Sequence, residues 1–209
     1  MTGLRERWRL KAMHTIQERA LDLFDAKGFG AVTIEEIAAA AEVSPSTVYR
    51  LFGTKEGIIV ADEFDTLNAE EIEAIVDPRD PIGSLIRSVR ADESAPERTP
   101  DSPDAAEGTP VNSGPWRRVR YHFTEPSVRM AACASADRTS QRLTPLIAST
   151  GRLTETQARV ATNALVFGYF AALEQWYLDG GDRPIADYVE EGMRPLRAIW
   201  PSAEPENRA

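Results

Sequence analysis

The apolar residues of this chain recur at intervals of three and four positions, which is the spacing of one buried face of an α-helix. In residues 5–27 the members of this face are Met13, Ile16, Ala20, Leu23 and Phe24. No segment shows the strict alternation of apolar and polar residues that marks a half-buried strand. The pattern therefore predicts an all-α fold, with a first helix over residues 5–27 that Gly28 ends.

Helix-capping residues divide the next part of the chain into short helices. Thr33 and Glu36 have the spacing of a capping box, which predicts a second helix to about residue 41. Ser44 suits an N-cap and Pro45 the first helical position, so a third helix is expected to run to residue 52. Thr54 is expected to cap a fourth helix that continues without a break to residue 76.

Proline and acidic residues interrupt the helical pattern after a fifth predicted helix over residues 81–91. Residues 91–115 hold five Pro, six Asp and Glu, and a single large aliphatic side chain. Such a composition buries too little apolar surface to offset the entropy of ordering, so we expect a mobile loop there. Further helices are expected from residue 116, over 127–149, from a capping box at Thr154 to residue 178, and over 184–200, before a polar tail at 202–209.

Residues 33–52 have the layout of two short helices joined by a tight turn, which is a helix-turn-helix. In that motif the second helix presents its N-terminal face to base edges in the major groove of DNA. Hydroxyl and cationic side chains suited to phosphate and base contacts lie on this face, opposite the packed Val48. The candidate DNA-binding residues are Thr33, Ser44, Ser46, Thr47, Tyr49, Arg50 and Lys55. Lys55 stands where the helix dipole favours an anion, which indicates a phosphate contact. A helical corner with a solvated face is the alternative that the pattern leaves open.

The distribution of charge changes what the formal net charge of −9 implies about nucleic acid. Residues 1–55 hold 8 Lys and Arg against 7 Asp and Glu, a net of +1, whereas residues 56–209 hold 16 against 26. Residues 1–11 alone carry four cations and one anion. Because a phosphate-binding surface needs local cations rather than a basic protein, the N-terminal part is compatible with DNA binding.

The segment 31–59, AVTIEEIAAAAEVSPSTVYRLFGTKEGII, closely resembles the N-terminal DNA-binding domain of the TetR (tetracycline-repressor-like) family. The matching positions are Thr33, Ile37-Ala38, Val43-Ser44, Thr47-x-Tyr49-x-x-Phe52 and Lys55-Glu56, and the likeness covers about residues 10–60. Glu42 stands where the turn usually has Gly, which predicts a non-glycine residue with a left-handed backbone. Leu51 stands where His or Tyr is frequent, which removes one possible phosphate donor.

The resemblance implies a helix-turn-helix domain over residues 1–54 and a helical regulatory and dimerisation domain over residues 55–209. It implies a ligand-responsive regulator, a repressor, that binds a palindromic operator on double-stranded DNA as a homodimer and is released by a small effector. The continuous fourth helix is expected to carry the effector signal as a rigid rod. The alternative is a protein-interaction module whose third helix contacts a partner protein instead of DNA.

Aromatic residues of the C-terminal part offer candidates for an effector site. In WRRVRYHF, residues 116–123, the rings could wall a cavity for an acyl-type or aromatic effector while Arg117, Arg118 or Arg120 meets an anionic head. An amphipathic helix with a solvated cationic face is the alternative reading of this stretch. The expected lining residues are Trp116, Arg120, Tyr121, Phe123, Met130, Phe167 and Phe170.

The uncharged run over residues 160–173 predicts a dimer interface. Its 14 residues are too few to span a bilayer, which needs about 20. Small residues recur in it at helical spacing and would let a second helix approach closely in a two-fold dimer. The expected interface residues are Ala161, Ala164, Gly168 and Ala172.

Several kinds of chemistry lack the residues that they need. The sequence has no Gly-rich phosphate loop and no nucleophile elbow. His14, His122 and Cys133 are far apart and lack the spacing of metal ligands. We therefore expect no enzyme, no cofactor and no metal site. Because the chain has one Cys and no apolar stretch at its N-terminus, we expect a soluble cytoplasmic protein without membrane association.

Overall fold

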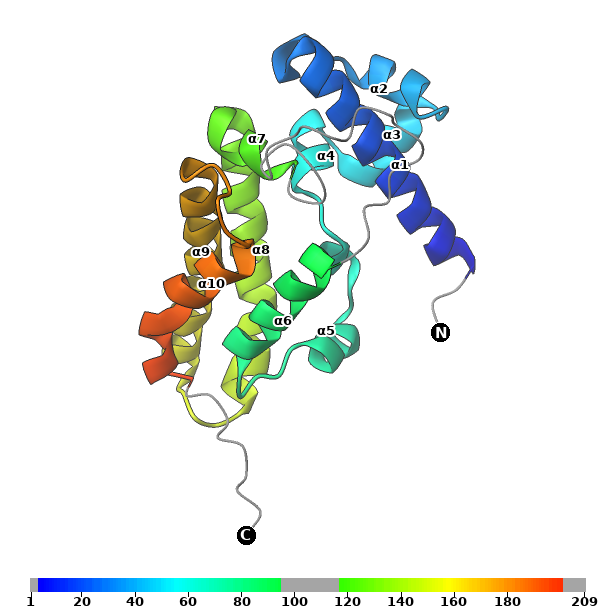
Figure 1. The fold of residues 1–209 in the computed structure, drawn as a ribbon. Coiled ribbons are helices and arrows are strands. Elements are labelled where there is room, and N and C mark those ends of the chain that lie inside the picture. Colours follow the sequence, from blue (N-terminus) through cyan, green and yellow to red (C-terminus); the bar gives the residue numbers. More distant parts are fainter. Residues whose placement is uncertain (1–3, 95–116, 201–209) are drawn as a thin grey trace. The chain divides into compact units, whose positions relative to one another are not determined.

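The computed structural model describes residues 4–94 and 117–200, which form helices and turns without a strand (Figure 1). The helices follow in the order α1 (Leu4–Lys27), α2 (Ile34–Ala40), α3 (Pro45–Phe52), α4 (Lys55–Val60), α5 (Ala69–Ile75), α6 (Pro81–Ser94), α7 (Val119–Thr124), α8 (Pro126–Ser149), α9 (Glu155–Leu178) and α10 (Ile185–Met193). This confirms the predicted all-α fold. Within the described residues, no helix is both long and apolar enough to cross a membrane.

The chain divides into two compact units, and the division does not follow the sequence order. The N-terminal unit comprises residues within 1–66 and also residues 121–133, whereas the second unit comprises residues within 67–120 and 134–209. The expected boundary at residue 54 therefore lies earlier than the boundary found in the structure. It also missed that α7 and the first turns of α8 supply part of the N-terminal unit.

The core of the N-terminal unit explains why these distant segments belong together. Phe24 of α1, Phe29 of the short 3-10 helix η1 (Phe29–Ala31) and Tyr121 of α7 pack with tilted or edge-to-face rings, with centroids 5.0 to 6.3 Å apart. The hydroxyl of Tyr121 donates a hydrogen bond to the carboxylate of Asp25. The other buried members include Ile16, Ala20, Ile37, Val48, Ile58 and Val128. Aromatic burial of this kind is among the largest single contributions that a small unit can gain.

The predicted continuous helix from residue 55 to 76 is wrong, because α4 ends at Val60. The side-chain amide of Gln17 donates to the carbonyl oxygens of Ile58 and Ala61, at 3.0 and 2.9 Å, and so satisfies carbonyls that a longer helix would bond internally. Asp62 then accepts from the backbone N–H of Phe64 at 3.1 Å, which favours a turn over further helix. A 3-10 helix, η2 (Glu63–Thr66), follows before α5.

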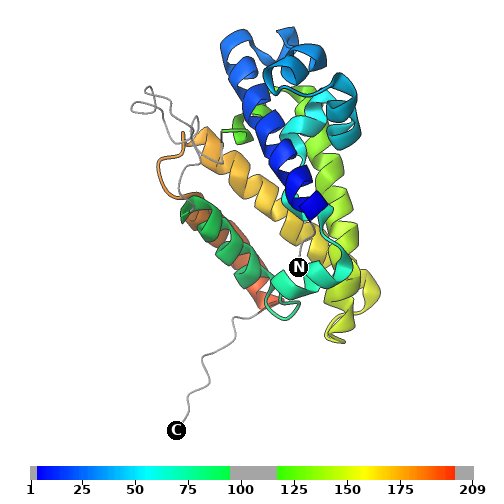
Figure 2. The ribbon, with the colours of Figure 1, turned by 90° about the vertical axis from the view of Figure 1, so that its right-hand side faces the viewer.

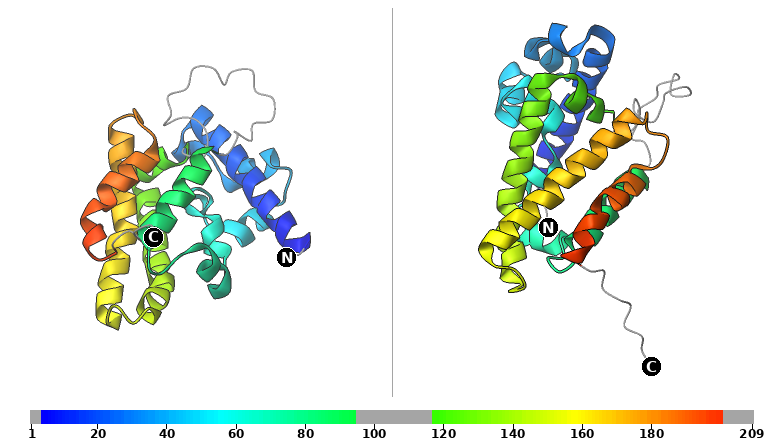
Figure 3. Two further views of the ribbon diagram at one scale, coloured as in Figure 1. Left: turned by 60° about the horizontal axis from the view of Figure 1, so that its bottom comes forward. Right: turned by 90° about the vertical axis from the view of Figure 1, so that its left-hand side faces the viewer.

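In the second unit, α10 packs along α9 and also lies beside α6. Figures 2 and 3 show α6 and α10 side by side. Arg197, in the 3-10 helix η5 (Arg194–Ala198) that follows α10, donates to the carboxylate of Asp80 at the start of α6, at 2.7 Å. Glu93 near the end of α6 accepts from the backbone N–H of Ile185 at 2.5 Å. Both ends of α10 are therefore tied to α6 by polar contacts.

The capping predictions hold where the structure describes the residues. Thr154 and Gln157 form the predicted capping box at the start of α9, and Pro126 opens α8 after the predicted break. The helix predicted to end at residue 91 continues to Ser94, so residues 91–94 are not part of a loop. The rest of the predicted mobile loop, residues 95–115, and the predicted tail at 202–209 lie outside the described residues.

Candidate DNA-binding site

Local signals in the sequence set the position of α3. Ser44 is the N-cap, its hydroxyl accepts the backbone N–H of Thr47 at 3.2 Å, and Pro45 occupies the first turn. Val48 is fully buried, and this anchors one side of α3 to the core. Ser44, Ser46, Tyr49 and Arg50 are exposed, as the helical spacing around Val48 requires. Half of the surface of Tyr49 is open to solvent.

The hydroxyls at the start of α3 form a connected cluster. The Oγ of Ser44 lies 2.8 Å from the Oγ of Ser46 and 2.9 Å from the Oγ1 of Thr47. Because each hydroxyl both donates and accepts, the cluster holds these side chains in place and still leaves capacity for an outside acceptor. It is thus preorganised for contact with a polar partner.

The turn between α2 and α3 has the geometry predicted from Glu42. Its φ angle is 56°, which is the only positive φ of a non-glycine residue in the described part of the chain. The N–H of Val43 donates to the carbonyl of Ala38 at 2.9 Å, so the turn also closes the end of α2. This confirms a left-handed residue at the position where glycine is usual.

Thr33 caps α2, and its hydroxyl is already engaged within the protein. It accepts the N–H of Glu36 at 3.2 Å, while the Glu36 carboxylate accepts the N–H of Thr33 at 2.9 Å. Lys27 donates to the same carboxylate at 2.8 Å. The hydrogen bonds from Lys27 and Thr33 lower the pKa of Glu36 from 4.5 to about 2. Thr33 thus caps α2 and is itself exposed, and its predicted contact with DNA stays a prediction.

Lys55 makes contacts within the N-terminal unit, and its predicted phosphate contact stays a prediction. Its Nζ donates to the carbonyl oxygens of Phe29 and Val32, at 2.7 and 2.9 Å, and lies 4.4 Å from the centroid of the Phe29 ring. The side chain is half-buried, and two of its three N–H groups face these carbonyls. Lys55 thus ties the start of α4 to the loop before α2.

A groove between α1 and α3 was not identified from the sequence. Its volume is about 460 Å³ and its lining residues are Trp8, Arg9, Ala12, Thr47, Arg50 and Leu51. Arg9 and Trp8 belong to the cationic stretch at the start of the chain, whose charge alone drew attention in the sequence. Because Trp8 and Arg9 are far from α3 in sequence, the sequence did not show that α1 and α3 border the same surface. The helical spacing of residues along α1 was the only local pattern that could have indicated which of its side chains share a face.

The residues expected to line an effector cavity are divided between the two units. Tyr121 is in the aromatic core of the N-terminal unit, and Met130, also in that unit, is 75% exposed. Phe123 contacts the ring of His122 and the guanidinium of Arg129. The sequence pattern could not show that this stretch contributes to the N-terminal unit. Trp116 lies outside the described residues.

The remaining effector candidates, Arg120, Phe167 and Phe170, belong to the second unit. Arg120 and Phe170 are half-buried and Phe167 is 38% exposed. These burial values leave their assignment as lining residues a prediction. Among the described residues, no group of three His, Cys, Asp or Glu side chains has a geometry that could hold a metal ion.

Two small residues of α9, Gly168 and Ala172, lie against α10 within the chain. A Cβ at Gly168 would lie 3.2 Å from the terminal methyl of Met193, and a Cβ at Gly192 would lie 3.4 Å from Ala172. Ala161 and Ala172 are buried, and Ala164 is half-buried. The small side chains thus let α10 approach α9 closely. The predicted place of Ala161, Ala164, Gly168 and Ala172 in a dimer interface stays a prediction.

The three N-terminal helices, with α3 fixed by its cap and polar on its exposed face, form a helix-turn-helix. Residues 16–61 match the model of the bacterial regulatory proteins of the tetR family. This N-terminal part of the chain is therefore similar to the DNA-binding domain of the tetR family.

Two curated relatives match part of the chain. The HTH-type transcriptional regulator BetI of Rhizobium meliloti (strain 1021) is 37% identical over 87 residues, which cover 38% of this chain and 43% of BetI. The HTH-type transcriptional regulator TcmR of Streptomyces glaucescens is 41% identical over 56 residues, 27% of this chain and 25% of TcmR. The chain therefore spans less than half the length of these relatives.

Solved structures extend the likeness of fold to nearly the whole chain. FadR of Thermus thermophilus, solved with lauroyl-CoA, has a TM-score of 0.50 and 19% identity, with 94% of this chain and 98% of FadR covered. NalD, a repressor of a multidrug efflux pump in Pseudomonas aeruginosa, has a TM-score of 0.51 and 20% identity, with 90% and 95% covered. At this level of identity the likeness concerns the fold alone.

Proposed function

We propose that the protein is a transcriptional regulator that binds a palindromic operator through α3. The observation that supports this most is the exposed polar face of α3, with Ser44, Ser46, Tyr49 and Arg50 outward while Val48 is buried. Hydroxyls and a guanidinium supply the donors and acceptors that phosphates and base edges require. The match of residues 16–61 to the tetR family supports the same conclusion.

The direct test is selection of duplex DNA from a random pool by the purified protein, followed by sequencing. We expect an enriched site made of two inverted half-sites spaced by about one helical turn, near 34 Å between centres. Affinity for this site should fall as salt is raised, because phosphate contacts release counterions. If the folded protein retains no duplex at low salt, the proposal fails, and a role for α3 in contacting a protein partner is favoured instead.

We further propose that the protein acts as a homodimer through the outer side of α9. Val160 and Leu178 are each 67% exposed and Phe167 is 38% exposed, and Ala164 and Ala171 continue the same helical spacing between them. Large apolar side chains left open along one helix indicate a covering partner. An isologous two-fold contact lets the same stripe cover itself.

Light scattering tests this interface. We expect twice the chain mass for the unaltered protein at micromolar concentration and the mass of one chain for Val160→Glu combined with Phe167→Glu. The matched control is Arg138→Glu with Gln141→Glu on the exposed side of α8, which should leave the dimer intact. A single-chain mass for the unaltered protein would overturn the dimer.

We propose that a small, largely apolar effector bound in the second unit weakens operator binding. Half-buried Arg120 and Phe170 are retained as candidate contacts, and lauroyl-CoA, found in the fold relative FadR, supplies an acyl-type probe with an anionic head. Coupling between two sites typically amounts to about 1–3 kcal/mol, so operator affinity should fall roughly 5- to 150-fold on saturation. An aromatic acid serves as the second probe. A probe that binds tightly and leaves operator affinity unchanged would contradict this control.

We assign the transmission of the effector signal to α8 instead of α4. The short α4 cannot serve as the rigid rod inferred from the sequence, whereas the boundary between the two units falls inside α8, between Cys133 and Ala134. A continuous helix transmits a displacement better than a turn does. Ala134→Gly with Ala136→Gly should therefore reduce the effect of the effector on operator affinity more than it reduces either affinity alone.

A further inference from the structure

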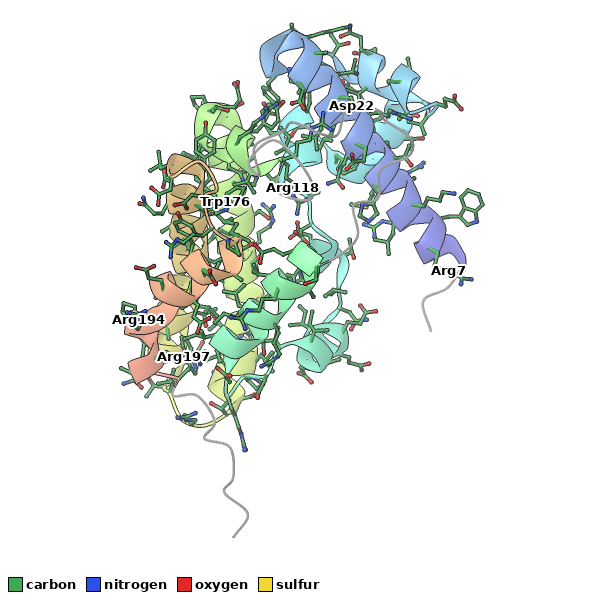
Figure 4. The ribbon with its side chains drawn as sticks, in the orientation of Figure 1. Arg7, Asp22, Arg118, Trp176, Arg194 and Arg197 are labelled. Atoms are coloured by element: carbon green, nitrogen blue, oxygen red, sulfur yellow. The ribbon has the colours of Figure 1, made fainter. Side chains whose placement is uncertain are left out.

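The first turns of α1 concentrate positive charge beside the helix-turn-helix. Residues 7–17 contain Arg7, Arg9 and Lys11 and no Asp or Glu, although the whole chain has a net charge of −9. Arg7 and Lys11 are exposed. Figure 4 shows Arg7 near the free end of α1. A local field of this kind attracts a polyanion even when the protein as a whole is acidic.

The groove between α1 and α3 combines these cations with apolar surface. Arg9 comes from α1 and Arg50 from α3, so the groove is bordered by a guanidinium on each side. Ala12 and Leu51 supply aliphatic surface, and Thr47 supplies a hydroxyl. Trp8 is 65% exposed, which leaves a large flat ring open at the groove. Trp side chains are highly buried on average, so a ring this open offers an unusually large apolar face for a contact.

A phosphodiester strand fits this combination better than a small anion does. Guanidinium groups bind phosphate oxygens in a bidentate manner, and the apolar face of a deoxyribose can pack against an indole ring. The groove is open and is lined by α1 and α3, and it shares Thr47 and Arg50 with the face of α3 that would enter the major groove. A DNA strand leaving α3 would therefore continue into the groove.

We propose that the α1–α3 groove holds the sugar–phosphate backbone of the operator strand beside the bases that α3 contacts. This rests on the proposed DNA binding and assigns new roles within it. Arg9 and Arg50 meet phosphate oxygens from opposite sides, and Trp8 packs on a deoxyribose. Arg50 is thus a backbone contact and contributes affinity without selecting a base.

The test measures binding of the full-length protein to the selected operator and to a mixed-sequence duplex over a range of salt concentrations. Arg9→Gln and Arg50→Gln should each weaken both duplexes by the same factor. Each should also reduce the slope of log affinity against log salt by about 0.9 for every phosphate that the variant no longer neutralises, which is about 1.8 for a dimer. Trp8→Ala should weaken both duplexes several-fold without changing the slope, and Trp8→Phe should keep most of the affinity.

Arg138→Gln is the matched control, since it removes one exposed cation from the second unit. It should leave the salt slope unchanged, and circular dichroism should show that all variants are folded. If Arg9→Gln and Trp8→Ala bind both duplexes as Arg138→Gln does, the groove proposal is overturned while DNA binding by α3 stands. If Arg50→Gln weakens only the operator, Arg50 contacts a base and its assigned role is wrong. Failure of the unaltered protein to bind any duplex would instead overturn the proposed function itself.

Discussion

The two units differ in how far short-range chemistry determines them. In the N-terminal unit, Thr33, Ser44 and Thr54 each accept a backbone N–H three residues ahead, and each helix begins where its cap stands. In the second unit, α9 is apolar on several sides, and its neighbours determine which side is buried. Gly168 packs against Met193 while Val160, eight residues earlier on the same helix, is 67% exposed. A capped helix start is therefore readable from a few residues, whereas the partner of an apolar face is not.

The strongest way to break this comparison is to place a charge at the α9–α10 contact. Gly168→Asp sets a carboxylate against the fully buried Met193, and no cation is provided to pair with it. Burial of an unpaired polar or charged group costs about 3 kcal/mol or more, so the second unit should unfold at much lower denaturant concentration. Urea unfolding followed by circular dichroism measures this loss.

Two matched variants separate charge from volume at the same position. Gly168→Asn has nearly the same size as Gly168→Asp and should cost less at neutral pH. Gly168→Ala should be close to neutral, because the gain in helix propensity of up to about 1 kcal/mol offsets a small shift of the flexible Met193 methyl. If Gly168→Asp left the unfolding curve unchanged and only halved the mass, this face would belong to a dimer interface, as the sequence had indicated.

The second variant tests the structural role of Lys55. Lys55→Met keeps the aliphatic stem but removes the hydrogen bonds to the carbonyls of Phe29 and Val32. Hydrogen bonds to charged groups contribute about 1.5–3 kcal/mol, so we expect a loss of roughly 2 kcal/mol in the stability of the N-terminal unit. Arg50→Met, on the exposed side of α3, should change stability by less than about 0.5 kcal/mol.

A measurement of DNA binding can contradict the structural role of Lys55. If Lys55→Met left the melting temperature unchanged and reduced the salt slope of DNA binding, the phosphate contact predicted from the sequence would be correct. The pair Lys55 and Arg50 thus compares a cation used inside the unit with one left at its surface.

How much of the fold was accessible from the sequence follows from the range of the interactions involved. The all-α class, the caps at Thr33, Ser44 and Thr154 and the left-handed Glu42 depend on contacts within a few residues, and the structure confirms them. The break after Val60 depends on Gln17, more than forty residues away, which no local pattern indicates. The same is true of Tyr121, which enters the core beside Phe24.

The candidate site divides in the same way. The exposure of Ser44, Ser46, Tyr49 and Arg50 follows from helical period alone. The engagement of Lys55 with two distant carbonyls and the groove shared by Trp8 and Thr47 require the packing of separate helices. The burial of Gly168 against Met193 requires it too, because small residues at helical spacing serve a contact within a chain and between chains equally well.

A third variant sharpens the claim that local chemistry governs the N-terminal unit. Glu42 has a φ of 56°, a conformation that costs a residue with a Cβ about 1–2 kcal/mol. Glu42→Gly removes this strain, but it also increases the conformational entropy of the unfolded chain, which lowers the stability by about 0.4–1 kcal/mol. The net expectation is a stabilisation of about 0.5–1 kcal/mol, visible as a higher melting temperature. Glu42→Ala keeps the Cβ and should give no such gain, and an equal gain in both variants would show that the Glu side chain, not the backbone, was the cause.

The smallest expected effect concerns the pH dependence of the capping box at α2. Hydrogen bonds from Lys27 and Thr33 hold the pKa of Glu36 at about 2, below its ordinary value of 4.5. A carboxylate whose pKa is lower in the folded state stabilises the fold above the unfolded pKa, and this contribution is lost as pH falls from about 4.5 toward 2. The effect should be modest, because the side chains of Lys27 and Glu36 are 48% and 39% exposed and solvent screens the pair. Glu36→Gln should therefore flatten the dependence of stability on pH between about 4.5 and 2 and leave its shape above pH 5 unchanged, as measured by thermal unfolding at low ionic strength.

Glu35→Gln, one residue earlier and exposed, is the control for lost charge alone. An equal flattening by Glu35→Gln would show that the net charge of the unit, rather than the bonds to Lys27 and Thr33, determines its acid sensitivity.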